Sequence, residues 1–208
     1  MATRKGKKRK NGNTFRRLLF VLCLLVALCF SGWKVWTSDY VQMHFVYLWP
    51  YQNEILSYSR KNNIDPFLVA AVMKNESKFK PNAVSHMGAV GLMQIMPETG
   101  DWIAGQMGLK DYTGEKLYDP ETNIRMGCWY LSELKHEFKD NMVLIMMAYN
   151  AGRGKTHGWM KANGWDYDFG RTGEIPYDDT RRYVDGVMRD RDMYYHLYKA
   201  SVAEKSGE

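Results

Sequence analysis

The chain has 208 residues and a formal net charge of +6, from 29 Lys and Arg against 23 Asp and Glu. Eight of the basic residues stand in positions 1–17, which contain no acid, so the rest of the chain carries 21 basic and 23 acidic residues. A nucleic-acid-binding domain needs its positive charge on the folded surface. This distribution therefore argues against that class, and we expect no nucleic acid among the partners.

An uncharged run of 16 residues, 18–33, follows the basic segment. Extended to Trp36, it has a helical length of about 28 Å, close to the roughly 30 Å of a bilayer core, and Lys34 reaches outward near the helix end. Basic residues beside a membrane helix stay in the cytoplasm. We therefore expect a cytoplasmic tail over 1–17, a single-pass anchor in the cell membrane over 18–36, a stalk over 37–49, and an extracellular domain beyond it.

A cleaved signal peptide is the alternative for this N-terminal segment, because signal peptides also combine a basic region with a short apolar run. The stretches "ALC" and "FSG" match a small-x-small cleavage site weakly. Lipoprotein processing needs a small residue before Cys29, and Leu28 stands there. Of the three cysteines only Cys128 lies beyond the apolar segment, so no disulfide can form within the domain.

Prolines and glycines divide the remainder into helical segments. Pro50, Pro66, Pro97 and Pro120 stand where helices begin, Asp65 and Asp119 are N-cap candidates, and Gly108 marks a helix end. No window shows the alternation of a strand. We expect helices over 50–61, 66–78, 97–107, 120–139, 141–150 and 178–199, with glycine-rich loops over 79–96 and 151–177. The sequence thus predicts one mainly α globular domain over 50–200, followed by a tail over 201–208.

Glu76 is out of place in the helix expected over 66–78, because it shares a face with the apolar Val72 and Met73. Partial burial raises the pKa of a carboxyl, and an acid that is protonated near neutral pH can donate its proton to a leaving oxygen. The alternative is that Glu76 lies in a frayed last turn and points to water.

Four stretches occur in a distinctive order. They are "ESKFKPNAVSHMGAVGLMQIMPETG" at 76–100, "DPETNIRMGCWYL" at 119–131, "AYNAG" at 148–152 and "IPYDDTRRYV" at 175–184. Together they resemble the signatures of lytic transglycosylases of the soluble-lytic-transglycosylase (SLT) type. The resemblance covers about residues 50–200 and implies a lysozyme-like domain, preceded here by one transmembrane helix. It also implies glycan strands of peptidoglycan as the substrate, and we expect neither a cofactor nor a metal.

The resemblance implies that Glu76 is the single catalytic acid and base. It further implies substrate contacts by Ser85, Gln94, Met96, Tyr149, Asn150 and Asp179. Asp179 departs from the family pattern, which usually has the longer Glu before the Thr, and this puts its contact in doubt. Tyr183 and Arg181 are expected to pack or cap rather than bind. Among the tryptophans, Trp159 and Trp165 are favoured as walls on which sugars stack, and the others as core.

The implied reaction cleaves the β-1,4 bond between N-acetylmuramic acid and N-acetylglucosamine, forms 1,6-anhydromuramic acid and consumes no water. Glu76 first protonates the bridging oxygen and then accepts the proton of the C6 hydroxyl, while the substrate's N-acetyl carbonyl replaces a second carboxylate. A hydrolytic muramidase on the same fold and a non-catalytic glycan-binding scaffold are the alternatives. No motif indicates a protein partner, or a role in growth, sporulation or conjugation.

Overall fold

The computed structural model describes residues 11–206 and divides into two compact units, Met1–Leu48 and Trp49–Glu208. The first unit contains the helix α1 (Asn11–Trp36), the short helix α2 (Asp39–Val41) and a π-helical turn over Gln42–Val46. Within α1, the 22 residues Phe15–Trp36 have a mean hydropathy of 2.3 and are long and apolar enough to cross a membrane. Residues 1–10 of the expected basic tail lie outside the described residues, and those from 11 onward are already helical.

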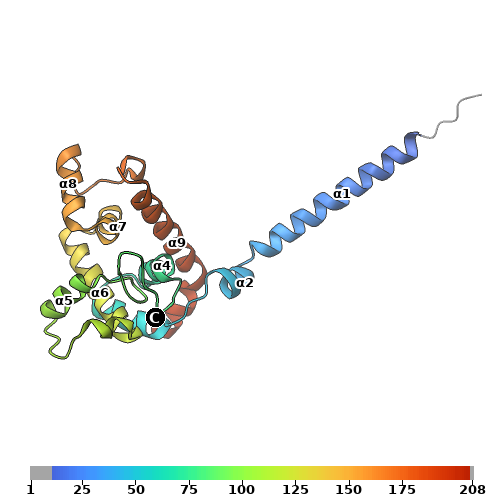
Figure 1. Ribbon diagram of the computed structural model, residues 1–208. Helices are drawn as coiled ribbons and strands as arrows, with labels where there is room; N and C mark the ends of the chain where they lie inside the picture. Colours follow the sequence, from blue (N-terminus) through green and yellow to red (C-terminus); the bar gives the residue numbers. More distant parts are fainter. Residues whose placement is uncertain (1–10, 207–208) are drawn as a thin grey trace, which may run out of the picture. The chain divides into compact units, whose positions relative to one another are not determined.

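The regular secondary structure described in the second unit consists of helices (Figure 1). Its helices are α3 (Gln52–Lys61), α4 (Pro66–Ser77), α5 (Pro97–Gln106), α6 (Pro120–Glu137), α7 (Met142–Ala151), α8 (Arg153–Asn163) and α9 (Asp178–Ser206), with 3-10 turns at Gly114–Tyr118 and Thr172–Glu174. Between residues 11 and 206 the only β pairing consists of the isolated bridges Val84–Val90 and Val90–Ile95. The prediction of a mainly α domain is confirmed.

Proline and aspartate begin two of the helices as the sequence predicts. Asp65 caps α4 by accepting a hydrogen bond from the Phe67 backbone N–H at 2.9 Å. Asp119 caps α6 by accepting one from the Thr122 N–H at 2.8 Å. The expectation for Pro50 is wrong, because α3 begins only at Gln52, after Tyr51 with a left-handed φ of 57°.

The region expected as a loop over 151–177 contains the eleven-residue helix α8, so that prediction is wrong. Gly154 and Gly158 lie inside this helix, although glycine costs about 1 kcal/mol relative to alanine in a helix interior. Thr156 and Met160, one turn apart, are buried, and α8 packs against α7. Tertiary packing therefore outweighs the glycines. Helix α9 likewise continues to Ser206, through most of the tail expected over 201–208.

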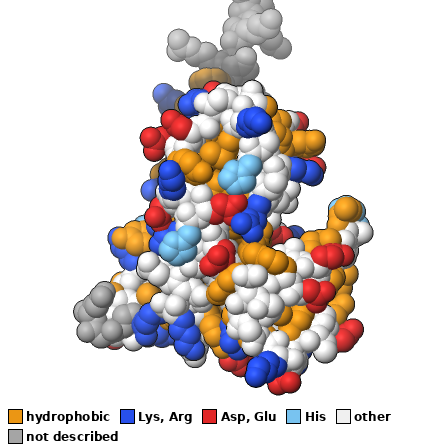
Figure 2. Space-filling view, turned by 90° about the vertical axis from the view of Figure 1, so that its left-hand side faces the viewer, with side chains coloured by type: hydrophobic (Ala, Val, Ile, Leu, Met, Phe, Trp, Pro, Cys, Tyr) orange, Lys and Arg blue, Asp and Glu red, His pale blue; other side chains and the backbone are white. Residues whose placement is uncertain are grey.

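Helix α4 is the centre of the core. Every residue from Phe67 to Met73 is buried, so this stretch of the helix is enclosed on all sides and not along one stripe. Helix α9 runs alongside α4 in Figure 1, and α3 also packs against α4. The last turn of this enclosed helix carries Glu76. Outside the core, the face seen in Figure 2 carries basic and acidic side chains interspersed, in keeping with the near-neutral charge of the domain.

The loop between α4 and α5 is held by the fully buried Asn123 of α6. Its Oδ1 accepts from the Met93 N–H at 2.8 Å, and its Nδ2 donates to the carbonyls of Val90 at 3.0 Å and Leu117 at 2.8 Å. Gly91 passes so close that a Cβ there would lie 2.3 Å from Nδ2, and its φ is +82°. Only glycine fits at this position, because both the left-handed φ and the close approach to Asn123 exclude a side chain.

Asn123→Ala is expected to lower the free energy of unfolding by about 3–5 kcal/mol, because three buried backbone groups lose their partner together. Urea unfolding followed by circular dichroism measures this loss. The matched control is Asn163→Ala, which removes one exposed hydrogen bond to the Trp159 carbonyl and is expected to change the free energy by at most about 0.5 kcal/mol. Equal effects of the two substitutions would contradict the role given to Asn123.

Candidate active site

Glu76 is a desolvated carboxyl at the end of α4. The helix ends at Ser77, and Lys78 follows with a left-handed φ of 52°. Burial raises the pKa of Glu76 from 4.5 to about 7, and the Tyr183 hydroxyl partly offsets this by favouring the ionised form. Glu76 itself is half-buried and lies within α4, which continues to Ser77, so the alternative of a frayed last turn facing water is wrong. A carboxyl with this pKa holds a proton for a substantial fraction of the time near neutral pH.

Two tyrosine hydroxyls lie near this carboxyl. The Tyr183 hydroxyl of α9 is buried, and within the described residues it forms no hydrogen bond of standard geometry. It is nevertheless close enough to Glu76 for each group to affect the pKa of the other. The Tyr149 hydroxyl of α7 donates to the Met93 carbonyl at 2.8 Å. Burial, followed by the Glu76 charge, raises the pKa of both tyrosines well above 10, so both stay neutral.

Tyr183 was expected to pack or cap rather than bind substrate; its hydroxyl is buried and lies near Glu76, a contact that the sequence did not suggest. The available signal was its place in the signature "IPYDDTRRYV". Spacing along that stretch did not distinguish a tyrosine that fills the core from one that reaches a carboxyl on another helix.

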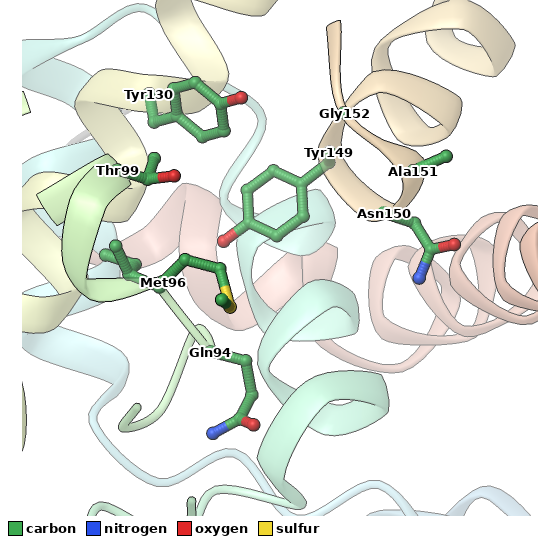
Figure 3. Close-up of a pocket in the computed structure, with 9 residues that line it drawn as sticks. Gln94, Met96, Thr99, Tyr130, Tyr149, Asn150, Ala151 and Gly152 are labelled. Atoms are coloured by element: carbon green, nitrogen blue, oxygen red, sulfur yellow. The ribbon is translucent and has the colours of Figure 1, made fainter. Parts of the chain in front are cut away.

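A pocket of about 220 Å³ lies beside Tyr149 (Figure 3). Its walls come from the loop before α5 and from α5, α6 and α7, and they consist of Gln94, Ile95, Met96, Thr99, Tyr130, Tyr149, Asn150, Ala151 and Gly152. Four of the residues expected to bind substrate therefore share one pocket. Glu76 is not part of its lining, and Tyr149, which lines the pocket and responds to the Glu76 charge, connects the two.

The backbone and side chain of Gln94 are both constrained. Its φ is +48°, and its Nε2 donates to the carbonyls of Ala83 at 3.1 Å and Gly91 at 2.9 Å. These bonds fix the amide and leave its oxygen as the group that can accept a hydrogen bond from a ligand. Asn150, from α7, also lines the pocket and is exposed, so the pocket offers polar groups from two separate elements.

Ser85 and Asp179 do not reach the pocket. Ser85 stabilises its own turn, since its Oγ accepts from the Ala89 N–H at 3.0 Å and its N–H donates to the Ala89 carbonyl at 2.9 Å. The Asp179 side chain is 91% exposed at the start of α9 and forms an ion pair with Arg182. The substrate contact predicted for Asp179 therefore has no support in this arrangement.

Two of the tryptophan assignments need correction, while the one for Trp159, which is half-buried, stays a prediction. Trp165 is only 9% exposed and stacks on Phe169 with ring centroids 3.9 Å apart, so its faces are not open to a sugar. Trp102, expected in the core, is 37% exposed and lines a second pocket together with Glu98, Thr99, Tyr130 and Arg153. Thr99 and Tyr130 belong to both pockets, so the second one continues the first.

The described residues show no group of three or more His, Cys, Asp or Glu side chains placed to hold a metal ion. Cys128 is buried in α6, and burial raises its pKa to about 12, so its thiol is not ionised at neutral pH. The ionisable and polar side chains at or beside the pocket include the Glu76 carboxyl, the Tyr130 and Tyr149 hydroxyls and the Gln94 and Asn150 amides.

The raised pKa of Glu76 predicts how stability depends on pH. In the unfolded chain the carboxyl ionises near pH 4.5 and in the folded chain near pH 7, so stability falls as pH rises through this window and then levels off. The loss amounts to at most about 3 kcal/mol. Glu76→Gln does not titrate, so it is expected to melt at a higher temperature than the wild type at pH 8.

The difference in melting temperature is expected to shrink as pH falls toward 4, and differential scanning calorimetry between pH 4 and 8 measures it. Glu115→Gln, at an exposed position, is the matched control and is expected to leave the pH profile unchanged. A constant difference between Glu76→Gln and wild type at all pH values would show that Glu76 titrates normally.

The family model described as "Transglycosylase SLT domain" matches residues 53–169 of this chain. The soluble lytic murein transglycosylase of Salmonella typhimurium is 34% identical over 167 residues, which cover 79% of this chain and 25% of that relative. Membrane-bound lytic murein transglycosylase C of Actinobacillus pleuropneumoniae is 30% identical, covering 67% of this chain and 44% of its own length. This chain thus spans about a quarter of the length of the soluble relative.

Two solved structures are similar over most of the chain. The 70 kDa soluble lytic transglycosylase of Escherichia coli matches with a TM-score of 0.69 and 29% identity, over 79% of this chain and 26% of that protein. An inactive mutant of the lytic transglycosylase Slt of Pseudomonas aeruginosa matches with a TM-score of 0.67 and 28% identity, over 82% of this chain and 27% of that protein.

Proposed function

This chain belongs to the transglycosylase SLT domain family, and on that premise we propose that it is a peptidoglycan lytic transglycosylase. It cleaves the β-1,4 bond between N-acetylmuramic acid and N-acetylglucosamine and leaves a 1,6-anhydromuramic acid end. The relatives named lytic murein transglycosylases support the substrate class. The observation that carries the proposal is the desolvated Glu76, with a pKa of about 7, beside the pocket of Gln94, Met96, Tyr149 and Asn150.

The proposed mechanism uses one protein carboxyl twice. Neutral Glu76 donates its proton to the bridging oxygen, and the N-acetyl carbonyl of the substrate stabilises the positive charge that develops at C1. The Glu76 carboxylate then accepts the proton of the C6 hydroxyl as that oxygen bonds to C1. A pKa near neutrality suits both steps, because the group must be a fair acid and, once ionised, a fair base.

A hydrolytic muramidase on the same fold is less well supported. Inverting glycosidases use a second carboxylate to activate water, and retaining ones use it as a nucleophile about 5 Å from the acid. Asp179, the further acid suggested by the sequence, is 91% exposed and paired with Arg182. A non-catalytic scaffold is also less well supported, because a protein that only binds glycan has no need of a desolvated acid beside its pocket.

The same proposal includes the location of the enzyme. Residues 18–36, within the apolar helical segment Phe15–Trp36, serve as a single membrane anchor, and the basic residues of 1–17 keep the N-terminus in the cytoplasm. The globular unit then faces the cell wall outside the membrane, where its substrate lies. The relative from A. pleuropneumoniae named as membrane-bound supports an enzyme of this family attached to a membrane.

Glu76→Gln is expected to lower the rate of peptidoglycan solubilisation by at least about a thousandfold, because a general acid contributes roughly 10²–10⁴-fold and this residue acts in both steps. Mass spectrometry of the wild-type products is expected to give 1,6-anhydromuropeptides, each one water lighter than a hydrolysis product. Glu115→Gln serves as the control for loss of a glutamate and is expected to retain the wild-type rate.

Asp179→Asn is expected to change that rate by less than about twofold, as for an exposed surface pair. Reducing muramic acid as the main product, or a loss in Asp179→Asn as large as that in Glu76→Gln, would contradict the single-carboxyl mechanism and support the muramidase.

The full chain is expected to stay in the membrane fraction of the cell, with its globular unit accessible from outside. Protease added to intact protoplasts should remove the globular unit and leave a short membrane-bound N-terminal fragment. Recovery from the medium of a soluble form beginning near residue 30 would instead support a cleaved signal peptide. Replacement of the Lys and Arg of residues 4–17 with Glu is expected to weaken the preference for a cytoplasmic N-terminus.

A further inference from the structure

Three residues of α9 at helical spacing, Tyr183, Gly186 and Asp190, face the last turn of α4. Tyr183 interacts with Glu76, and a Cβ on Gly186 would lie 2.9 Å from the Asn75 Oδ1. Asp190 bonds to the same turn, as described next. The stripe therefore brings α9 against the part of α4 that carries the catalytic carboxyl.

Asp190 is a buried carboxylate, only 4% exposed. Its Oδ2 accepts hydrogen bonds from the Lys74 Nζ and the Asn75 Nδ2, each at 2.9 Å. The Asn75 Nδ2 also donates to the Ala71 carbonyl at 2.9 Å, one turn earlier in α4. A single carboxylate thus joins two consecutive side chains of α4, and the second of them directly precedes Glu76.

Stability alone does not explain such an ion pair. A buried ion pair adds little net stability compared with apolar residues of the same volume, but it restricts how two elements can be arranged. The last turn of a helix tends to fray, and Glu76 lies only two residues before Lys78, where the helix ends with a φ of 52°. On the other side of this turn, the Ser77 hydroxyl donates to the Leu92 carbonyl at 2.7 Å. The turn is therefore held from two directions.

We propose that Asp190 is a positioning residue, which holds the last turn of α4 against α9 so that the Glu76 carboxyl stays desolvated opposite the Tyr183 hydroxyl. The role rests on the proposed lytic activity, in which Glu76 is the acid. Asp190 does not touch the substrate pocket, and it acts through Lys74 and Asn75. Loss of this contact lets the turn loosen and admits water to Glu76.

Asp190→Asn and Lys74→Gln test the proposal in the full-length protein. The first removes the charge with little change of shape, and the second removes the ammonium partner from a more exposed site, with 23% of the Lys74 side chain exposed. The matched control is Arg191→Gln. It breaks a second ion pair between α9 and α4, between Arg191 Nε and Asp65 Oδ2 at 2.7 Å, which lies at the start of α4 and away from Glu76.

Both test variants are expected to lower kcat by roughly tenfold to a hundredfold, with KM within about twofold, as for a misplaced catalytic group. The alkaline limb of the pH–rate profile is expected to move to lower pH. Carbon-13 NMR of the Glu76 carboxyl is expected to show its pKa falling from about 7 toward its ordinary value of 4.5. The Tyr149 and Tyr183 hydroxyls, which face Glu76 from α7 and α9, remain neutral in this range and do not confuse the titration.

Arg191→Gln is expected to leave kcat and the Glu76 titration unchanged. If Asp190→Asn does not fold, Lys74→Gln alone decides the outcome. A folded variant with wild-type kcat, or one in which the Glu76 carboxyl still titrates near pH 7, would overturn the positioning role. Absence of lytic activity in the wild type would defeat the proposed function only, because the NMR titration tests the position of Glu76 without turnover.

Discussion

The enclosure of α4 by the other helices is the constraint on which the rest of the structure depends. Because every residue from Phe67 to Met73 is buried, this stretch of the helix has no solvent-facing side, and the last turn that follows it stands at the edge of the core. Glu76 stands there. Its proton affinity is set first by the loss of water, and the Tyr183 hydroxyl opposes that effect only in part. The position of Glu76 at the edge of the core thus gives its carboxyl the raised pKa that the proposed chemistry needs.

The polar groups of the site are fixed by bonds inside the protein. The Gln94 amide is tied to two backbone carbonyls, and the Tyr149 hydroxyl is tied to the Met93 carbonyl. The loop that carries Gln94 is itself held by Asn123 from α6. The side chains of such a pocket lose their conformational entropy on folding, so little more is lost when a ligand binds. In the proposed function, the substrate would then meet preorganised groups next to one titratable acid.

Several structural features followed from local chemistry and were predictable. Proline at the first turn and aspartate at the N-cap set the starts of α4 and α6, because these preferences depend on neighbouring backbone groups alone. The helix α8 was not predictable in this way. Its glycines lower its intrinsic helix propensity, and the helix exists because Thr156 and Met160 are buried in contacts with residues distant in sequence.

The features of the candidate site can likewise be separated into those that local sequence indicates and those that tertiary packing decides. The sequence by itself indicated Glu76 as the candidate acid, through its place on an apolar face and the signature around it, and it also indicated four of the pocket residues. Only the tertiary structure decided that Tyr183 reaches Glu76, that Trp102 is exposed while Trp165 is buried, and that Asp179 points to solvent. These outcomes depend on how α9 and α5 dock against other helices. Spacing within a segment encodes a face of that segment, but not which side chain of another segment will meet it.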